Sequence, residues 1–104
     1  MSSKQEFHPG VKTGQYIGDG EASQAITGVG FQPRFVKIWT HATGDADAWV
    51  FEKTEDFATD RSVTHYQGYH LNRAGRLKSL DADGFTVAGE ANTNGQVYDY
   101  IAIG

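Results

Sequence analysis

Turn-forming residues interrupt this chain at short and regular intervals, and this spacing restricts the fold more than any other feature. Glycine occupies 13 of the 104 positions, and turn signals recur about every 8 to 12 residues. The runs between them are rich in Val, Ile, Thr and aromatic side chains, which suit pleated strands. We therefore predict an all-β fold, a single antiparallel β-sandwich or barrel-like domain of about eight short strands.

The length of the chain corresponds to one domain with a single core. Residues 1–10 are polar and lack periodicity, so we assign them to an N-terminal arm and residues 11–104 to the β-domain. The arm is either a frayed terminus or a segment that becomes ordered against a partner. In the second case we expect Phe7, His8 and Pro9 to make the contact.

The charge balance and the absence of cysteine exclude several classes of function. With 9 Lys and Arg against 13 Asp and Glu, the formal net charge is −4. This argues against a nucleic-acid partner, because phosphate binding needs a basic face. Thiol chemistry and thiolate metal sites require the missing cysteine. No apolar run approaches the ~20 residues of a membrane span. We expect no nucleic-acid partner, no membrane partner and no cofactor.

Residues 34–41 form the clearest predicted strand. Val36 and Ile38 alternate with polar or aromatic neighbours, so we expect them to point inward and Trp39 to point outward. Residues 48–51 are expected to return beside this strand and complete a hairpin.

Two further turn signals predict hairpins. Asp19–Gly20 lies between expected strands at 11–17 and 23–27, and Asp-Gly favours a tight reversal. The turn at 92–95 is expected to close the last hairpin before a strand at 96–103.

The last strand carries a carboxylate on a face that we expect to be buried. Asp99 alternates with three apolar residues, Val97, Ile101 and Ile103. A buried carboxylate must be paired or have a shifted pKa. We expect either that this is an edge strand or that Asp99 forms an ion pair with Arg34 or Lys37 across the sheet, with a role as the acid of a site as the alternative.

The middle of the chain has the weakest pattern. Residues 52–64 lack Gly and Pro and carry many charges, which fits either one helical turn near 55–58 or a long surface loop. Residues 64–70 alternate weakly, as one strand would. On one strand His65 and His70 lie on opposite faces, so they are not expected to bind one metal ion.

Two acidic turns resemble the beginnings of metal sites. His41 precedes Asp45 and Asp47, a set that could hold a divalent ion or serve a small hydrolase. We interpret it as a solvated hairpin tip, because no nucleophile motif accompanies it. Residues 81–84 resemble the start of a calcium loop but lack its later ligands, and we interpret them as a turn. No metal is predicted.

The aromatic side chains outnumber what one small core face can hold. Such residues can fill a core, anchor an oligomer interface or form a stacking platform for sugars. We select Trp39, Trp49 and Tyr66 as oligomer or ligand contacts. The full set is Trp39, Trp49, Tyr66, Tyr69, Tyr98 and Tyr100.

The order of the turn motifs resembles a small β module of tailed-phage structural proteins, which occurs in head decoration, tail and fibre accessory proteins. The first half of the pattern is TGQYIGDG (13–20) followed by QAITGVGFQPRFVKI (24–38). The second half is LDADGFTVAG (80–89) followed by NTNGQVYDYIA (92–102).

The resemblance implies a non-enzymatic virion structural protein without catalytic residues. A capsid decoration protein of the phage head is the first expectation, made in the host cytoplasm and located on the virion. Its partners would be the major capsid protein, or another virion protein, and further copies of itself, with a trimer favoured. The alternative is a carbohydrate-binding or host-attachment module of a phage tail or fibre, with a glycan as partner.

Overall fold

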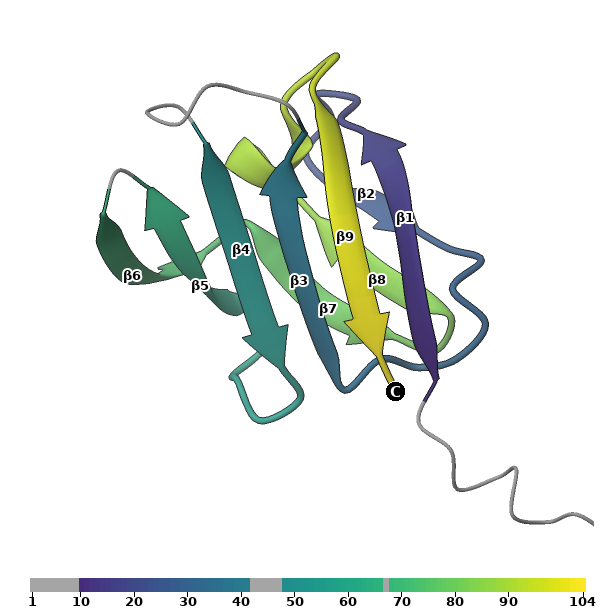
Figure 1. The fold of residues 1–104 in the computed structure, drawn as a ribbon. Coiled ribbons are helices and arrows are strands. Elements are labelled where there is room, and N and C mark those ends of the chain that lie inside the picture. The colour runs from purple at the N-terminus through teal and green to yellow at the C-terminus, as the bar shows by residue number, and fades with distance from the viewer. Residues whose placement is uncertain (1–9, 42–47, 67) are drawn as a thin grey trace, which may run out of the picture.

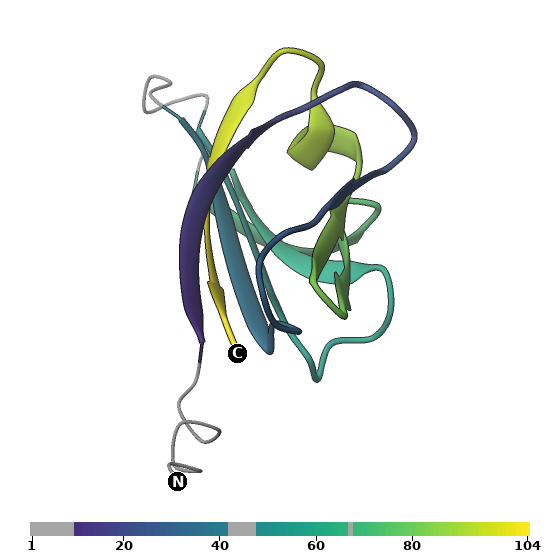
Figure 2. The same ribbon diagram turned by 90° about the vertical axis from the view of Figure 1, so that its right-hand side faces the viewer.

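The protein folds into two antiparallel sheets packed face to face (Figures 1 and 2). The computed structural model describes residues 10–41, 48–66 and 68–104. Over these residues the predicted all-β sandwich-like fold is confirmed, with nine strands. The strands are β1 (Val11–Ile17), β2 (Gln24–Ile26), β3 (Phe35–Thr40), β4 (Trp49–Thr54), β5 (Arg61–Tyr66), β6 (Tyr69–Ala74), β7 (Leu77–Asp81), β8 (Gly84–Val87) and β9 (Val97–Ile103).

The larger sheet has the order β1-β9-β3-β4-β5-β6, and the smaller has the order β2-β8-β7. The core lies between them. Val36 and Ile38 of β3 are fully buried, as predicted, and Phe51 of β4 is buried beside Ile38, its partner in the ladder. From the smaller sheet, Phe85 and Val87 complete the contact. The predicted hairpin of residues 34–41 with the returning strand at 48–51 is confirmed, because β3 pairs with β4.

Three tyrosines belong to this core. Tyr16 and Tyr98 stack with ring centroids 4.9 Å apart, and Tyr100 packs edge-on against Phe85 at 5.0 Å. The Tyr98 hydroxyl donates to the Glu90 carbonyl and accepts from the Thr93 amide. Of the three roles considered for the aromatic residues, Tyr98 and Tyr100 therefore take core filling, and the hydroxyl group of the buried Tyr98 satisfies two backbone groups.

The two turns at Asp19–Gly20 and 92–95 do not close hairpins. β1 pairs with β9, and β2 pairs with β8, so each turn carries the chain from one sheet to the other. A turn residue determines that the chain reverses, but not which strand it then joins. At the second crossing a short 3₁₀ helix, η3 (Gly89–Asn92), lies between β8 and β9.

The face of β9 that carries Asp99 is the outward one, which corrects the prediction. Tyr98, Tyr100 and Ala102 point into the core, and Asp99 lies on the opposite face, partly exposed. Both faces of β9 are rich in apolar residues, so alternation alone does not select the inner face. The expected partners are also wrong: Arg34 pairs with Glu55, and Lys37 pairs with Glu52. The edge-strand alternative is wrong as well, because β9 lies between β1 and β3.

The segment 52–64 contains neither a helical turn nor a long loop. β4 continues to Thr54, a short turn follows, and β5 begins at Arg61. Lys53 points inward and donates to the carbonyl oxygens of Ala58 (2.9 Å) and Arg61 (2.6 Å), which holds the turn against the sheet. Burial lowers the pKa of Lys53, and the nearby Asp60 carboxylate opposes that shift.

The segment 64–70 is a hairpin rather than one strand. β5 ends at Tyr66 and β6 begins at Tyr69, so His65 and His70 stand directly opposite each other. The prediction that they lie on opposite faces is wrong, because the chain reverses between them. Within the described residues, no helix has the length and apolar character needed to cross a membrane.

Candidate functional site

The inner face of β4, β5 and β6 is only partly covered by the smaller sheet. β7 packs against β4 and β5, whereas every residue of β6 is exposed. Figure 1 shows β6 at the edge of the larger sheet, outside the area that the smaller sheet covers. Phe51 of β4 still belongs to the core, but the inward side chains nearer the β5–β6 turn line an open cleft.

Three aromatic side chains form a row across this cleft. The ladder places Trp49 opposite Tyr66, and Tyr66 opposite Tyr69, on the same face of three adjacent strands. Trp49 and Tyr66 are stacked, with centroids 4.0 Å apart and ring planes 16° apart. Tyr69 is 66% exposed and Leu71 is 39% exposed. We call this surface the aromatic cleft. It has a volume of about 380 Å³ and is lined by Trp49, Thr64, Tyr66, Tyr69, Leu71, Arg73 and Arg76.

The polar groups at the aromatic cleft include two arginines and a threonine. Arg73 is exposed, while Arg76 donates to the Ala74 carbonyl (2.9 Å) and forms an ion pair with Glu90 (2.5 Å). The buried Thr64 hydroxyl oxygen has no hydrogen-bond partner within the described residues. An apolar hollow with a few polar groups is the usual form of a binding site, and this one carries the exposed Arg73 while the charge of Arg76 is paired with Glu90.

Sequence analysis selected part of this site. Trp49 and Tyr66 are brought together, whereas Trp39 lies on the outer face of β3. The arm residues Phe7, His8 and Pro9 lie outside the described residues. Leu71 and Arg73 were not predicted, because residues 69–74 did not stand out as a strand, although they alternate with His70, Asn72 and Ala74. Arg76 follows the turn after β6, and no pattern in the sequence marks it.

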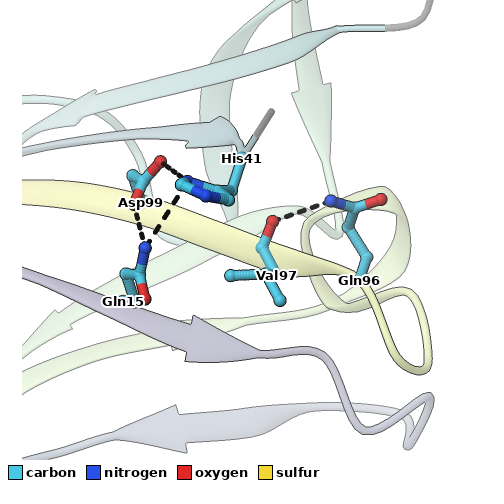
Figure 3. Close-up of polar contacts among 5 residues, drawn as sticks. All are labelled: Gln15, His41, Gln96, Val97 and Asp99. Carbon is cyan, nitrogen blue, oxygen red and sulfur yellow. Dashed lines mark hydrogen bonds and ion pairs between the residues drawn. The ribbon is translucent and has the colours of Figure 1, made fainter. Parts of the chain in front are cut away.

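A second cluster surrounds Asp99 on the outer face of the larger sheet (Figure 3). Its carboxylate lies 2.7 Å from Nδ1 of His41 and accepts a hydrogen bond from Gln15 at 2.8 Å. Hydrogen bonds from His41 and Gln15 hold the pKa of Asp99 below its usual value, and the bond from His41 has the larger effect. Trp39 stands opposite Asp99 in the ladder. A shallow hollow of about 280 Å³ is lined by Thr13, Gly14, Gln15, Trp39, Asp99 and Tyr100.

A paired carboxylate and imidazole can hold a proton or orient a hydroxyl group. The third member here is the amide of Gln15, which is not a nucleophile, so these contacts support binding better than hydrolysis. The residues expected to assist His41, namely Asp45 and Asp47, lie outside the described residues.

A further hollow, of about 500 Å³, is a weaker candidate. It lies beside the turn that follows β4 and includes Lys53, Lys78 and Arg34. Lys53 already donates to two carbonyl oxygens, and Arg34 is paired with Glu55. Two of its three cationic side chains are therefore engaged within the chain.

Comparison with protein-family models, curated proteins and solved structures finds no significant match for this chain. In the described part of the chain, no three His, Asp or Glu side chains gather closely enough to hold a metal ion by themselves.

Proposed function

We propose that this chain is a non-enzymatic structural accessory protein of a tailed-phage particle, and that it decorates the head as a homo-oligomer, most simply a trimer. The arm residues Phe7, His8 and Pro9 contact the shell. The aromatic cleft contacts a neighbouring copy. The observation that carries the proposal is the partly exposed row of Trp49, Tyr66 and Tyr69, in a cleft that Arg73 and Arg76 also line.

The composition of the aromatic cleft favours a protein partner. Trp, Tyr and Arg are the residue types that dominate the energy of protein interfaces. The exposed Arg73, on a chain of net charge −4, also complements the acidic surface of another copy. Many such contacts on a symmetric shell add as avidity, so each can be weak.

The arrangement of the resemblance motifs is compatible with this proposal. The two halves of the pattern supply β1, β2, β3, β8 and β9, which pair with one another as β1-β9-β3 and β2-β8. The aromatic cleft comes instead from residues 49–76, which the quoted motifs do not include. Proteins that share a fold often keep the same core and differ in the added segments that bind their partners.

The direct test is the composition of purified particles. Cells that carry the gene are induced to release particles, which are analysed by mass spectrometry and by immunogold labelling. We expect the chain in the particles, with label on the head. Absence from the particles would contradict the proposal, and label on the tail would replace the head assignment with a tail role.

Deletion of residues 2–10 tests the arm. The truncated protein is expected to keep the circular dichroism spectrum and melting temperature of the full chain, because the sheets begin at Val11. It should no longer bind particles that lack the native protein. Attachment equal to that of the full chain would remove the arm from the proposal.

A carbohydrate-binding or host-attachment role is the second candidate. The observation that favours it is the outer hollow, where Trp39 offers a stacking face beside the hydrogen-bonding groups of Asp99 and Gln15. A glycan array with Trp39→Ala as the matched variant tests this role. A saturable signal that Trp39→Ala loses supports sugar binding, and an empty array counts against it.

A further inference from the structure

Two histidines face each other on the outer surface of the β5–β6 hairpin. His65 and His70 are directly opposed in the antiparallel ladder. Their Nδ1 atoms lie 2.5 Å apart, and the ring planes are nearly perpendicular, with centroids at 4.5 Å. The two rings therefore present the same nitrogen to each other. Their position on the face opposite to the aromatic cleft makes this a separate feature of the same hairpin.

A carboxylate orients one of the two rings. Glu52 on β4 lies 3.4 Å from Nε2 of His65, and Lys37 lies 3.6 Å from the other carboxylate oxygen of Glu52. Donation from Nε2–H to Glu52 leaves Nδ1 of neutral His65 with its lone pair directed at His70. This is the second-shell arrangement that metal-binding histidines commonly have, in which the distal N–H is held by a carboxylate.

We propose that His65 and His70 bind a divalent first-row transition-metal ion through their Nδ1 atoms, with Glu52 as the positioning residue for His65. Two bonds of about 2.0 Å at a tetrahedral angle need the nitrogens about 3.3 Å apart. His70 is exposed and His65 is only partly buried, so the rings can separate by this amount. Water completes the coordination shell.

The ligand type sets the metal preference. Imidazole nitrogen suits Cu²⁺, Ni²⁺ and Zn²⁺, whereas Mg²⁺ and Ca²⁺ select oxygen ligands. Two protein ligands impose little geometry on the ion, so the order of affinities should follow the general preference of nitrogen ligands. Cu²⁺ should therefore bind more tightly than Ni²⁺, and Ni²⁺ more tightly than Mn²⁺.

Binding would also join the exposed edge strand to its neighbour. Among the described strands, β6 is hydrogen-bonded to β5 alone, and an ion shared by His65 and His70 adds a link between the two strands. A ligand that binds only the folded state raises stability by mass action. The melting temperature of the full chain should therefore rise with Ni²⁺ concentration until the site is saturated.

Calorimetric titration of tag-free full-length protein with NiCl₂ tests the proposal. We expect saturable binding of one ion per chain, which His65→Gln and His70→Gln each abolish. His41→Gln and His8→Gln are matched controls, because they remove the other two imidazoles of the chain, and both should bind as the wild type does. MgCl₂ should give no signal.

Two outcomes would overturn the proposal. One is the absence of saturable Ni²⁺ and Cu²⁺ binding, which would leave His65 and His70 as a hydrogen-bonded structural pair. The other is binding that survives both His65→Gln and His70→Gln, which would place the ion elsewhere. Circular dichroism of each variant confirms that it is folded. Glu52→Gln should weaken binding several-fold without abolishing it, and an unchanged affinity would remove Glu52 from the site.

Discussion

Single carboxylates connect distant segments of this chain. Asp83 accepts hydrogen bonds from the backbone amides of Gly30 (2.7 Å) and Gly28 (3.0 Å), which fastens the loop after β2 to the turn between β7 and β8. Both hydrogen bonds lower the pKa of Asp83, and the bond from Gly30 has the larger effect. Asp99 has a lowered pKa for a related reason, since His41 and Gln15 bind its charged form.

The lowered pKa values predict a loss of stability in acid. A carboxylate whose folded-state pKa lies below its unfolded value of about 3.9 stabilises the fold above that pH. This stabilisation is lost as the pH falls through the folded-state value. We expect the melting temperature to decrease below about pH 4. Between pH 5 and pH 2.5 the melting temperature of Asp83→Asn, measured by circular dichroism, should decrease less than that of the wild type. An equal decrease in this variant would contradict the assignment.

The Tyr98 hydroxyl is expected to contribute to stability despite its small size. Tyr98→Phe leaves the Glu90 carbonyl and the Thr93 amide without this partner, which should lower the free energy of unfolding by about 1–2 kcal/mol. Urea denaturation measures the difference. Tyr69→Phe, at an exposed ring, is the control and should change the value by no more than about 0.5 kcal/mol. Equal stabilities for Tyr98→Phe and the wild type would contradict the role of the hydroxyl.

Among the secondary-structure elements, β6 and β9 differ strongly in their hydrogen bonding and in their burial. β9 is hydrogen-bonded on both sides, to β1 and β3, and alternate residues along it are buried. β6 is an edge strand with no buried residue. Local opening is easiest where few apolar contacts must be broken. The hairpin that carries the aromatic cleft and the histidine pair is therefore the part of the fold most easily altered by a partner or an ion.

Hydrogen exchange should resolve this difference. Amides of β6 in the isolated protein are expected to exchange orders of magnitude faster than those of β9, because β9 opens only with the whole core. Mass spectrometry with short pulses at neutral pH can compare the two strands. Comparable protection of β6 and β9 would contradict the prediction and would show that another surface covers the edge.

At the scale of the whole molecule, exposed apolar side chains are present on both faces of the larger sheet. Val11 and Ile17 are 63% and 59% exposed on the outer face, and Tyr69 and Leu71 are exposed on the inner one. Water contact with such side chains is unfavourable. Association with further copies of the chain, as proposed above, would bury part of this surface.

The mass in solution tests that association. Light scattering over a concentration series should give three times the chain mass of 11.4 kDa, and Tyr69→Ala should shift the equilibrium toward the monomer, because it removes an exposed ring of the aromatic cleft. Asn72→Ala is the matched control on the other face of β6. A monomer at every concentration would contradict the trimer in solution and leave assembly on the particle as the remaining form of the proposal.

Local patterns determined a large part of this fold. The bounds of the strand at Val11–Ile17, the inward direction of Val36 and Ile38, and the all-β class follow from alternation and turn chemistry. These properties depend on residues close together in the chain, and the pleat reverses the side-chain direction at each step. For this reason they could be predicted without knowing any partner strand.

The tertiary structure alone decided how the strands are shared between the sheets and which face each one buries. Asp99 is outward because the smaller sheet covers the tyrosine face of β9. The row of Trp49, Tyr66 and Tyr69 and the opposition of His65 and His70 arise from the register of three strands. Register is a property of pairing between segments, and a shift of one residue would move every side chain to the other face.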